Sequence, residues 1–191
     1  KKLSPEFQKD GDIIKALLRK TGYLFKDLDE TFRNRADILL AALDGDCVTN
    51  PIIYALPGAL TEENIDKSLK KHFISFSGGL SPVLLGSKLF LLKYLEKYPD
   101  SNLYKKLSPE LQKDRDVALA FLSINAYCFK ELDEMFRNDS DILSFALREP
   151  LDKADENPII YALPGALTKE NIDKALDMDC HKTSEWLLDN E

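Results

Sequence analysis

The side chains with the greatest chemical potential in this chain are two histidines and three cysteines. The histidines are His72 and His181, and the cysteines are Cys47, Cys128 and Cys180. Nucleophilic catalysis needs a base held within hydrogen-bond reach of the nucleophile, usually oriented by a third group. Neither histidine lies in a sequence motif of this kind. We therefore expect no enzyme activity and assign no catalytic residue.

Two other groups of residues resemble ligand sites but lack the required spacing. Cys180 and His181 lie beside Asp177 and Asp179, yet this order matches no familiar structural zinc pattern. The segment 77–79, Ser-Gly-Gly, lacks the Gly-x-x-x-x-Gly-Lys spacing of a phosphate-binding loop. We read it as a linker, and we expect no metal and no cofactor.

The elements that must position any site are duplicated within the chain. Residues 1–43 match residues 105–147 at 26 of 43 positions, and residues 50–69 match residues 157–176 at 18 of 20. A shorter period lies inside each copy, since LSPEFQKDGDIIKALL aligns with LDETFRNRADILLAAL at an offset of 25 residues. Internal repetition at this period is typical of stacked helical repeats.

The cysteines fit this repeat without a disulfide framework. Three is an odd number, and no Cys-x-x-Cys spacing occurs. Cys128 stands where the first copy has Leu24, which predicts a small buried thiol. A reducing compartment is the simpler interpretation.

Composition limits the classes of partner. The net charge is −7 with 31% charged residues, so a nucleic-acid backbone is not expected to bind. No apolar run reaches the length of a membrane-spanning helix. The first residues already belong to a repeat, so we expect the sequence to be a fragment of something longer. The 44% of apolar residues are enough for a hydrophobic core without metal or disulfide support.

Apolar periodicity and capping residues predict the helices. Ser4-Pro5-Glu6 predicts a short helix over 5–9, and Ile13, Ile14, Leu17 and Leu18 form one apolar stripe of a longer helix capped by Asp10 or Asp12 and stopped by Gly22. The same pair of helices is predicted at 29–34 and 37–43. Thr61 and Thr168 are predicted N-caps of helices that run to about Lys70 and Met178.

The segment NPIIYALPGAL is the best candidate binding element because it is almost unchanged between the copies. Between its prolines at most one or two helical turns are expected. Packing alone would explain an inward plug of Ile and Leu, whereas the two tyrosines offer aromatic faces to a partner. The candidate binding residues are Tyr54, Pro57, Gly58, Tyr161, Pro164 and Gly165.

We predict an all-α fold in which two tandem copies of a multi-helix repeat unit pack around a connecting apolar helix. The first copy covers residues 1–69, a connector with a buried helix at 88–98 covers residues 70–104, and the second copy with a C-terminal helix near Trp186 covers residues 105–191. Residues 73–82 are expected to form a loop. This arrangement predicts a single cooperative unfolding transition.

The repeated pattern L-x-x-x-F-x-x-D-x-D-I-h-x-x-A-L, in which h is a hydrophobic residue, resembles the short helical repeats of unknown function found in tandem in secreted effector proteins of intracellular bacteria. The resemblance covers residues 3–43 and 107–147. It implies an all-helical module that acts in a host cytosol and contacts host or bacterial proteins. It implies no active site.

Three functions follow as hypotheses. The first is a non-catalytic interaction module that binds a protein, because stacked helices create extended surfaces. The second is a small-ligand or nucleotide-binding domain with a pocket near NPIIYALPGAL in each copy. The third is a structural spacer in a larger effector.

Overall fold

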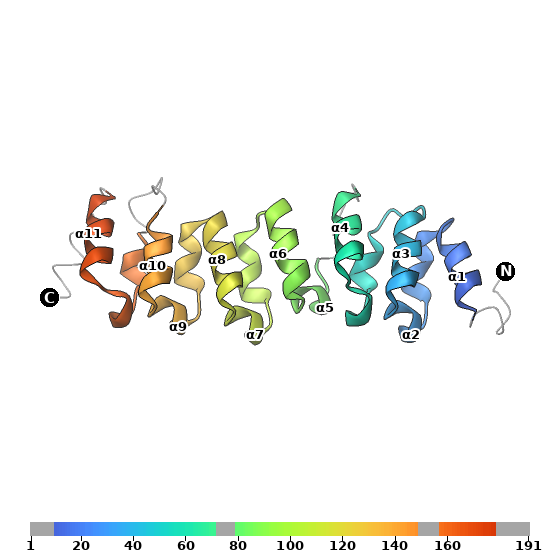
Figure 1. The fold of residues 1–191 in the computed structure, drawn as a ribbon, viewed down its shortest axis with the longest axis horizontal. Helices are drawn as coiled ribbons and strands as arrows, with labels where there is room; N and C mark the ends of the chain where they lie inside the picture. Colours follow the sequence, from blue (N-terminus) through green and yellow to red (C-terminus); the bar gives the residue numbers. More distant parts are fainter. Residues whose placement is uncertain (1–9, 72–78, 149–156, 179–191) are drawn as a thin grey trace. The chain divides into compact units, whose positions relative to one another are not determined.

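The computed structural model describes residues 10–71, 79–148 and 157–178. The chain divides into two compact units, unit 1 at Lys1–Lys97 and unit 2 at Tyr98–Glu191. Every regular element of the described residues is helical (Figure 1), which confirms the all-α prediction. None of the described helices is both long and apolar enough to cross a membrane.

Unit 1 alternates α-helices with 3₁₀ helices, which are labelled η. Its elements are α1 (Gly11–Leu18), η2 (Gly22–Asp27), α2 (Glu30–Arg33), α3 (Ala36–Asp44), η3 (Pro51–Tyr54), η4 (Pro57–Ala59), α4 (Glu62–Lys70), α5 (Pro82–Leu85) and α6 (Lys88–Lys97).

Unit 2 has the same kinds of element. They are η5 (Ser101–Lys106), α7 (Pro109–Gln112), α8 (Arg115–Ile124), η6 (Ala126–Glu131), α9 (Glu134–Arg137), α10 (Ser140–Ala146), η8 (Pro158–Tyr161), η9 (Pro164–Ala166) and α11 (Lys169–Asp177).

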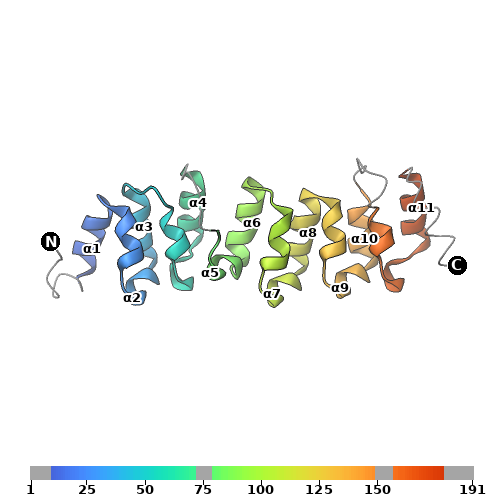
Figure 2. The same cartoon turned by 180° about the vertical axis from the view of Figure 1, so that it is seen from behind.

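One local pattern recurs: a short helical turn, a longer α-helix and a 3₁₀ helix. In unit 1 the longer helices start at Gly11, Ala36, Glu62 and Lys88, at intervals of 25, 26 and 26 residues. NPIIYALPGAL is therefore no insertion between repeats. It supplies the 3₁₀ helix that ends one repeat (η3) and the short turn that begins the next (η4), and it lies between α3 and α4 (Figure 2).

Asp10, Thr61 and Thr168 cap their helices as the sequence predicts. Asp10 accepts hydrogen bonds from the backbone N–H groups of Asp12 and Ile13, and Thr61 accepts one from that of Asn64. Asp12 itself lies inside the helix and pairs with Lys15. The predicted helices at 29–34, 37–43, 88–98 and after Thr61 and Thr168 are confirmed as α2, α3, α6, α4 and α11, with ends shifted by a residue or so.

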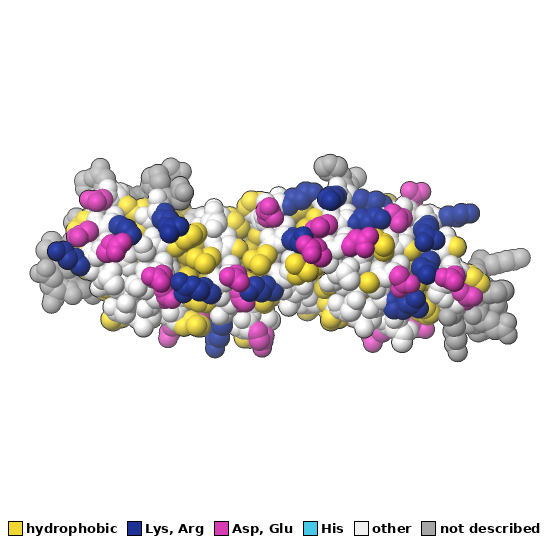
Figure 3. Space-filling view, in the orientation of Figure 1, with side chains coloured by type: hydrophobic (Ala, Val, Ile, Leu, Met, Phe, Trp, Pro, Cys, Tyr) yellow, Lys and Arg dark blue, Asp and Glu magenta, His cyan; other side chains and the backbone are white. Residues whose placement is uncertain are grey.

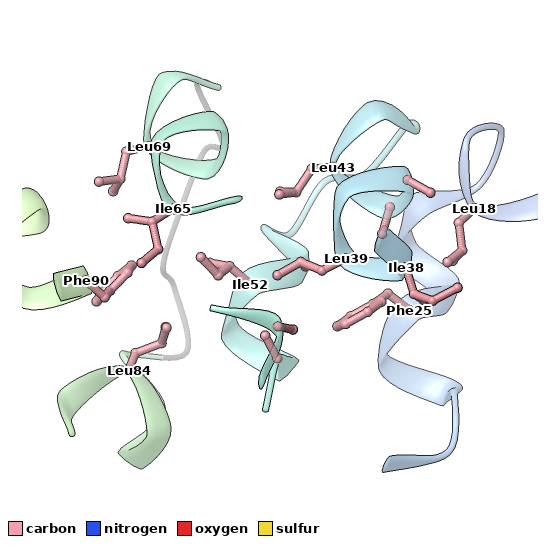
Figure 4. Packing of buried hydrophobic residues seen from close by; sticks show 14 of the residues in the cluster. Leu18, Phe25, Ile38, Leu39, Leu43, Ile52, Ile65, Leu69, Leu84 and Phe90 are labelled. Atoms are coloured by element: carbon pink, nitrogen blue, oxygen red, sulfur yellow. The ribbon is translucent and has the colours of Figure 1, made fainter. Parts of the chain in front are cut away.

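The core of unit 1 is a continuous cluster between successive helices (Figure 4). Leu18 of α1, Ile38 and Leu39 of α3 and Ile65 of α4 are almost completely buried, and Phe90 of α6 extends the cluster. Because burial of a large aliphatic side chain contributes about 1.5–3 kcal/mol, this cluster is the main source of stability in unit 1.

Gly22 does not have the predicted role as a helix stop. Helix α1 already ends at Leu18, and Gly22 begins η2 against the end of α3. A Cβ atom at Gly22 would lie 2.3 Å from the carbonyl oxygen of Ala42, and one at Gly45 would lie 2.0 Å from that of Leu18. Both glycines therefore allow backbones to approach closely.

Helix α6 is less buried than its composition indicates. Phe90, Leu91 and Leu95 are buried, but Leu89 is 41% exposed and Lys93 reaches across to α4. The position of this helix at the seam of two packed copies stays a prediction. The expected short helix at 5–9, most of the 73–82 loop and Trp186 lie outside the described residues.

Candidate functional site

The candidate binding element is fixed to the following helix by a buried asparagine. Asn50 is 1% exposed, its Oδ1 accepts from the N–H of Ile52 at 3.2 Å, and its Nδ2 donates to the carbonyl of Ser68 at 3.1 Å. Asn157 in unit 2 accepts from Ile159 at 3.1 Å and donates to Ala175 at 3.3 Å. A buried amide with satisfied partners fixes the position of its neighbours.

The Pro-Gly corner at Pro57 and Gly58 is held by the end of the short helix α2. The N–H of Gly58 donates to Asn34 Oδ1 at 2.7 Å, and that of Leu56 donates to the carbonyl of Arg33 at 3.1 Å. A Cβ at Gly58 would lie 2.7 Å from the carbonyl oxygen of Asn34. Pro57 starts the 3₁₀ turn at a position that needs no N–H donor.

The second Pro-Gly corner repeats this geometry. The N–H of Gly165 donates to Asn138 Oδ1 at 2.7 Å, and that of Leu163 donates to the carbonyl of Arg137 at 2.8 Å. Pro164 begins η9 as Pro57 begins η4. Pro57, Gly58, Pro164 and Gly165 are exposed, but their contacts account for their repetition through folding alone.

Another buried asparagine joins each element to two helices. Asn64 Nδ2 donates to the carbonyls of Ala36 and Ala59, both at 2.9 Å. Asn171 donates to those of Ser140 at 2.8 Å and Ala166 at 3.0 Å. These side chains were not singled out from the sequence. The sequence does mark them, because each is an asparagine within the apolar stripe of a helix, at the position where α3 has Ile38.

The tyrosines of the element are only partly buried. Tyr54 packs beside the core and lines a small cavity of about 50 Å³ with Tyr23 and Lys26 of η2. Tyr161 lies under the ammonium of Lys130, whose Nζ is 5.9 Å from the ring centroid. The two tyrosines belong to different units, and each has an aromatic or cationic neighbour within its own unit.

In both units these side chains lie on stacked 3₁₀ helices, which we call the 3₁₀ face. Helix η2 packs against η3 in unit 1, and η6 packs against both η5 and η8 in unit 2. Tyr23 on η2 is 54% exposed. The sequence analysis assigned no element to η2, η5 or η6, because a single 3₁₀ turn has no apolar periodicity of its own.

Charged side chains of both signs lie close together on this face of the molecule (Figure 3), and several of those on α4 and α6 form ion pairs. Lys93 Nζ lies 2.6 Å from Asp66 Oδ1 and 3.0 Å from Glu62 Oε1, and Lys67 lies 2.5 Å from Asp44. The hydrogen bonds that Lys93 donates, first to Asp66 and then to Glu62, raise the pKa of Lys93 above its ordinary value. We interpret this network as a connection between helices.

The cysteine chemistry agrees with the sequence where it is described. Cys128 is 4% exposed, and burial raises the pKa of its thiol to about 11. Burial likewise raises the pKa of Cys47, whose Sγ lies 3.6 Å from the carbonyl of Gly45. Cys180 and both histidines lie outside the described residues, within which no group of His, Cys, Asp or Glu is arranged to hold a metal ion.

Comparison with known proteins adds one similarity. No curated protein and no solved structure matches the chain. Residues 87–137 match the family model of a domain of unknown function, DUF4116. This stretch runs from Ser87, just before α6, to the end of α9, and so covers two longer helices with the 3₁₀ helices that follow them. Over this stretch the chain is similar to DUF4116.

Proposed function

We propose that the chain is a non-catalytic helical-repeat module that binds another protein through its 3₁₀ face. The observation that carries this proposal is the placement of tyrosines on stacked 3₁₀ helices: Tyr23, which is 54% exposed, lines one cavity with Tyr54 in unit 1, and Tyr161 on η8 is partly exposed in unit 2. Tyrosine is enriched at the energetic centres of protein interfaces, because its ring buries much area and its hydroxyl forms hydrogen bonds.

The rigidity of the face also supports a binding role. Its tyrosines are attached to backbone that buried asparagines hold in place, such as Asn50 before η3 and Asn157 before η8. A surface that is ordered before binding loses less conformational entropy on association. Tyr54 and Tyr161 can therefore contribute to binding while the rest of NPIIYALPGAL maintains the fold.

The small-ligand alternative, which predicts a pocket near NPIIYALPGAL, receives less support. The cavity beside Tyr54 measures about 50 Å³, whereas small-molecule sites usually measure about 300–1,000 Å³. A protein surface needs no such enclosure. The spacer alternative predicts that no partner depends on these tyrosines, so the same experiment distinguishes it.

The resemblance to repeats of secreted bacterial effectors guides the choice of partner. We propose a host protein as the first class to test, with the module acting in the host cytosol. This choice rests on the repeat pattern in residues 3–43 and 107–147.

An affinity pull-down from host-cell lysate, read by quantitative mass spectrometry, tests the proposal. The test variant carries Tyr23→Ala and Tyr54→Ala, and its fold is verified by circular dichroism and thermal unfolding. Met135→Ala is the matched control, because Met135 is also 54% exposed but lies on the short helix α9.

A protein that is retained by the native chain and the control but lost by the tyrosine variant supports the proposal. If every retained protein binds all three chains equally, the 3₁₀ face of unit 1 is not the binding surface. A repeat with Tyr161→Ala then decides the same question for unit 2.

A further inference from the structure

One face of α11 in unit 2 carries two apolar side chains that are buried at the corresponding place in unit 1. At the sequence offset of 107 residues that relates the copies, the corresponding residues of α4 and α11 are Ile65 with Ile172 and Leu69 with Leu176. On α4 these side chains are 0% and 6% exposed. On α11 the isoleucine is partly exposed and Leu176 is 45% exposed. The same pair is therefore covered on α4 and uncovered on α11.

Unit 1 shows what covers this pair on α4. Helix α6 packs against α4, and Phe90 of α6 belongs to the same buried cluster as Ile65 (Figure 4). Tyr94, one turn further along α6, packs against this cluster. At the end of α4, Lys97 Nζ donates a hydrogen bond to the carbonyl of Leu69. A helix that covers α11 in the same way needs two large apolar side chains one turn apart and a basic side chain near its end.

Helix α1 meets this description on the side that is not buried. The starts of α1 and α6, Gly11 and Lys88, are 77 residues apart. At this offset Ile13, Leu17 and Lys20 take the positions of the three α6 residues named above. Ile13 and Leu17 are partly exposed, and Lys20 is exposed. Helix α1 thus presents the kinds of side chain with which α6 covers α4.

We propose that a second copy of this chain docks its α1 on the α11 of the first, in the arrangement that α6 has on α4. The apolar side chains of α1 then cover those of α11, and the ammonium of Lys20 donates a hydrogen bond to the carbonyl of Leu176. This surface is separate from the 3₁₀ face, so the inference goes beyond the proposed function and does not depend on it. A contact between unlike faces builds rings or growing chains of copies rather than two-fold symmetric dimers.

The association is weak because its side chains are already partly buried within their own units. Only the remaining apolar area leaves the water on docking, and the cost of immobilising two chains is set against it. Each copy also carries a net charge of −7, so the copies repel one another at low salt. A moderate rise in salt concentration should therefore strengthen this association, since salt screens the repulsion and leaves the apolar contact in place.

Sedimentation velocity with the full chain, from about 10 µM to about 1 mM, tests the proposal. Leu176→Glu blocks the α11 face, Ile13→Glu blocks the α1 face, and Lys20→Ala removes the ammonium alone. Met135→Glu is the matched control, because Met135 is an exposed apolar side chain on α9. Thermal unfolding of each variant at low concentration verifies its fold.

The native chain should form larger species as its concentration rises. Each glutamate variant should weaken the association about tenfold or more, Lys20→Ala by a smaller factor, and Met135→Glu not at all. A mixture of the two glutamate variants retains one intact face of each kind. It should therefore form a 1:1 dimer and nothing larger, which distinguishes blocked docking from a loss of folding.

A native chain that stays monomeric at the highest concentration overturns the proposal, and so does association that both glutamate variants retain. If Leu176→Glu lowers the unfolding temperature of the monomer more than Met135→Glu does, a segment of the same chain covers α11 and the second copy is the wrong occupant. Loss of self-association in the Tyr23→Ala and Tyr54→Ala variant would place it on the 3₁₀ face instead. None of these outcomes affects the pull-down test of the proposed function.

Discussion

The side chain of Asn34 and the backbone of Gly58, 24 residues apart in sequence, form a 2.7 Å hydrogen bond that docks one repeat on the next. Asn138 and Gly165 form the same bond at 2.7 Å in unit 2. Each glycine lies so close to its asparagine that no Cβ atom fits without a shift.

Gly58→Ala should therefore destabilise the fold by about 1–3 kcal/mol, because the new methyl group would overlap the carbonyl of Asn34. Gly165→Ala should cost less, since its nearest neighbours are side-chain atoms of Asn138 that can rotate away. Urea denaturation measures both changes. Equal stability of Gly58→Ala and the native chain would contradict the close approach.

Asn64→Ala should lower the free energy of unfolding by about 2–4 kcal/mol, because the carbonyls of Ala36 and Ala59 both lose a donor. Asn171→Ala should have a similar effect on unit 2. Glu63→Ala is the control on the exposed side of α4 and should change stability by about 0.5 kcal/mol or less. A loss no larger than the control would show that the amide is dispensable.

One pair of positions carries different charges in the two copies. Arg115 Nη1 lies 2.6 Å from Asp139 Oδ2, whereas the corresponding residues in unit 1 are Gly11 and Arg35. A double-mutant cycle with Gly11→Arg and Arg35→Asp should yield a favourable coupling of about 0.2–1 kcal/mol.

High salt should reduce this coupling, since Arg35 is exposed and Gly11 is partly exposed. Thermal unfolding of the four chains at low and high ionic strength supplies the measurement. A coupling of zero at low salt would show that the unit 2 pair cannot be transplanted.

Asp139 links stability to pH. Burial opposes its ionisation, but hydrogen bonds from the N–H of Ile142, from Arg115 and from the N–H of Asp141 outweigh it and lower the pKa of Asp139 below 3.8. The stabilisation is therefore present above that ordinary value and is lost as the pH falls through the lowered pKa of the folded state.

Asp139→Ala should accordingly cost about 0.5–2 kcal/mol at pH 7, the usual value of an N-cap, and progressively less at acidic pH. Chemical denaturation across a pH series shows the trend. Glu134→Ala, which removes an exposed acid, should show little change at pH 7. A pH-independent penalty at Asp139 would exclude the ionised cap as its cause.

The thiol of Cys128 should react very slowly in the folded protein, because burial raises its pKa to about 11. At pH 8 roughly one thiol in a thousand would be ionised, and access is blocked as well. Alkylation with iodoacetamide, resolved by peptide mass spectrometry, should label Cys128 only after denaturant is added. Labelling at the rate of a free thiol would show that η6 opens readily.

The sequence allowed the longer helices to be predicted, because each has apolar residues at helical spacing and some, such as α1 and α4, also have a capping residue, Asp10 or Thr61. It predicted at most one or two helical turns between the prolines of NPIIYALPGAL, where η3 and η8 lie, but not the other 3₁₀ helices, since their short turns have no periodic signal. Of the predicted binding residues, Tyr54 and Tyr161 lie on the 3₁₀ face, while Gly58 serves the backbone contact with Asn34.

The amides of Asn64 and Asn171 donate to backbone carbonyls, so these contacts do not depend on the side chains of the residues that they bind. Asn64 binds the carbonyl of Ala36, and Asn171 makes the same contact with Ser140 although the side chain differs. Contacts of this kind hold neighbouring helices together through the backbone. The side chains of the contacting helices can therefore change, and acquire new specificities, while the register in which the helices stack stays the same.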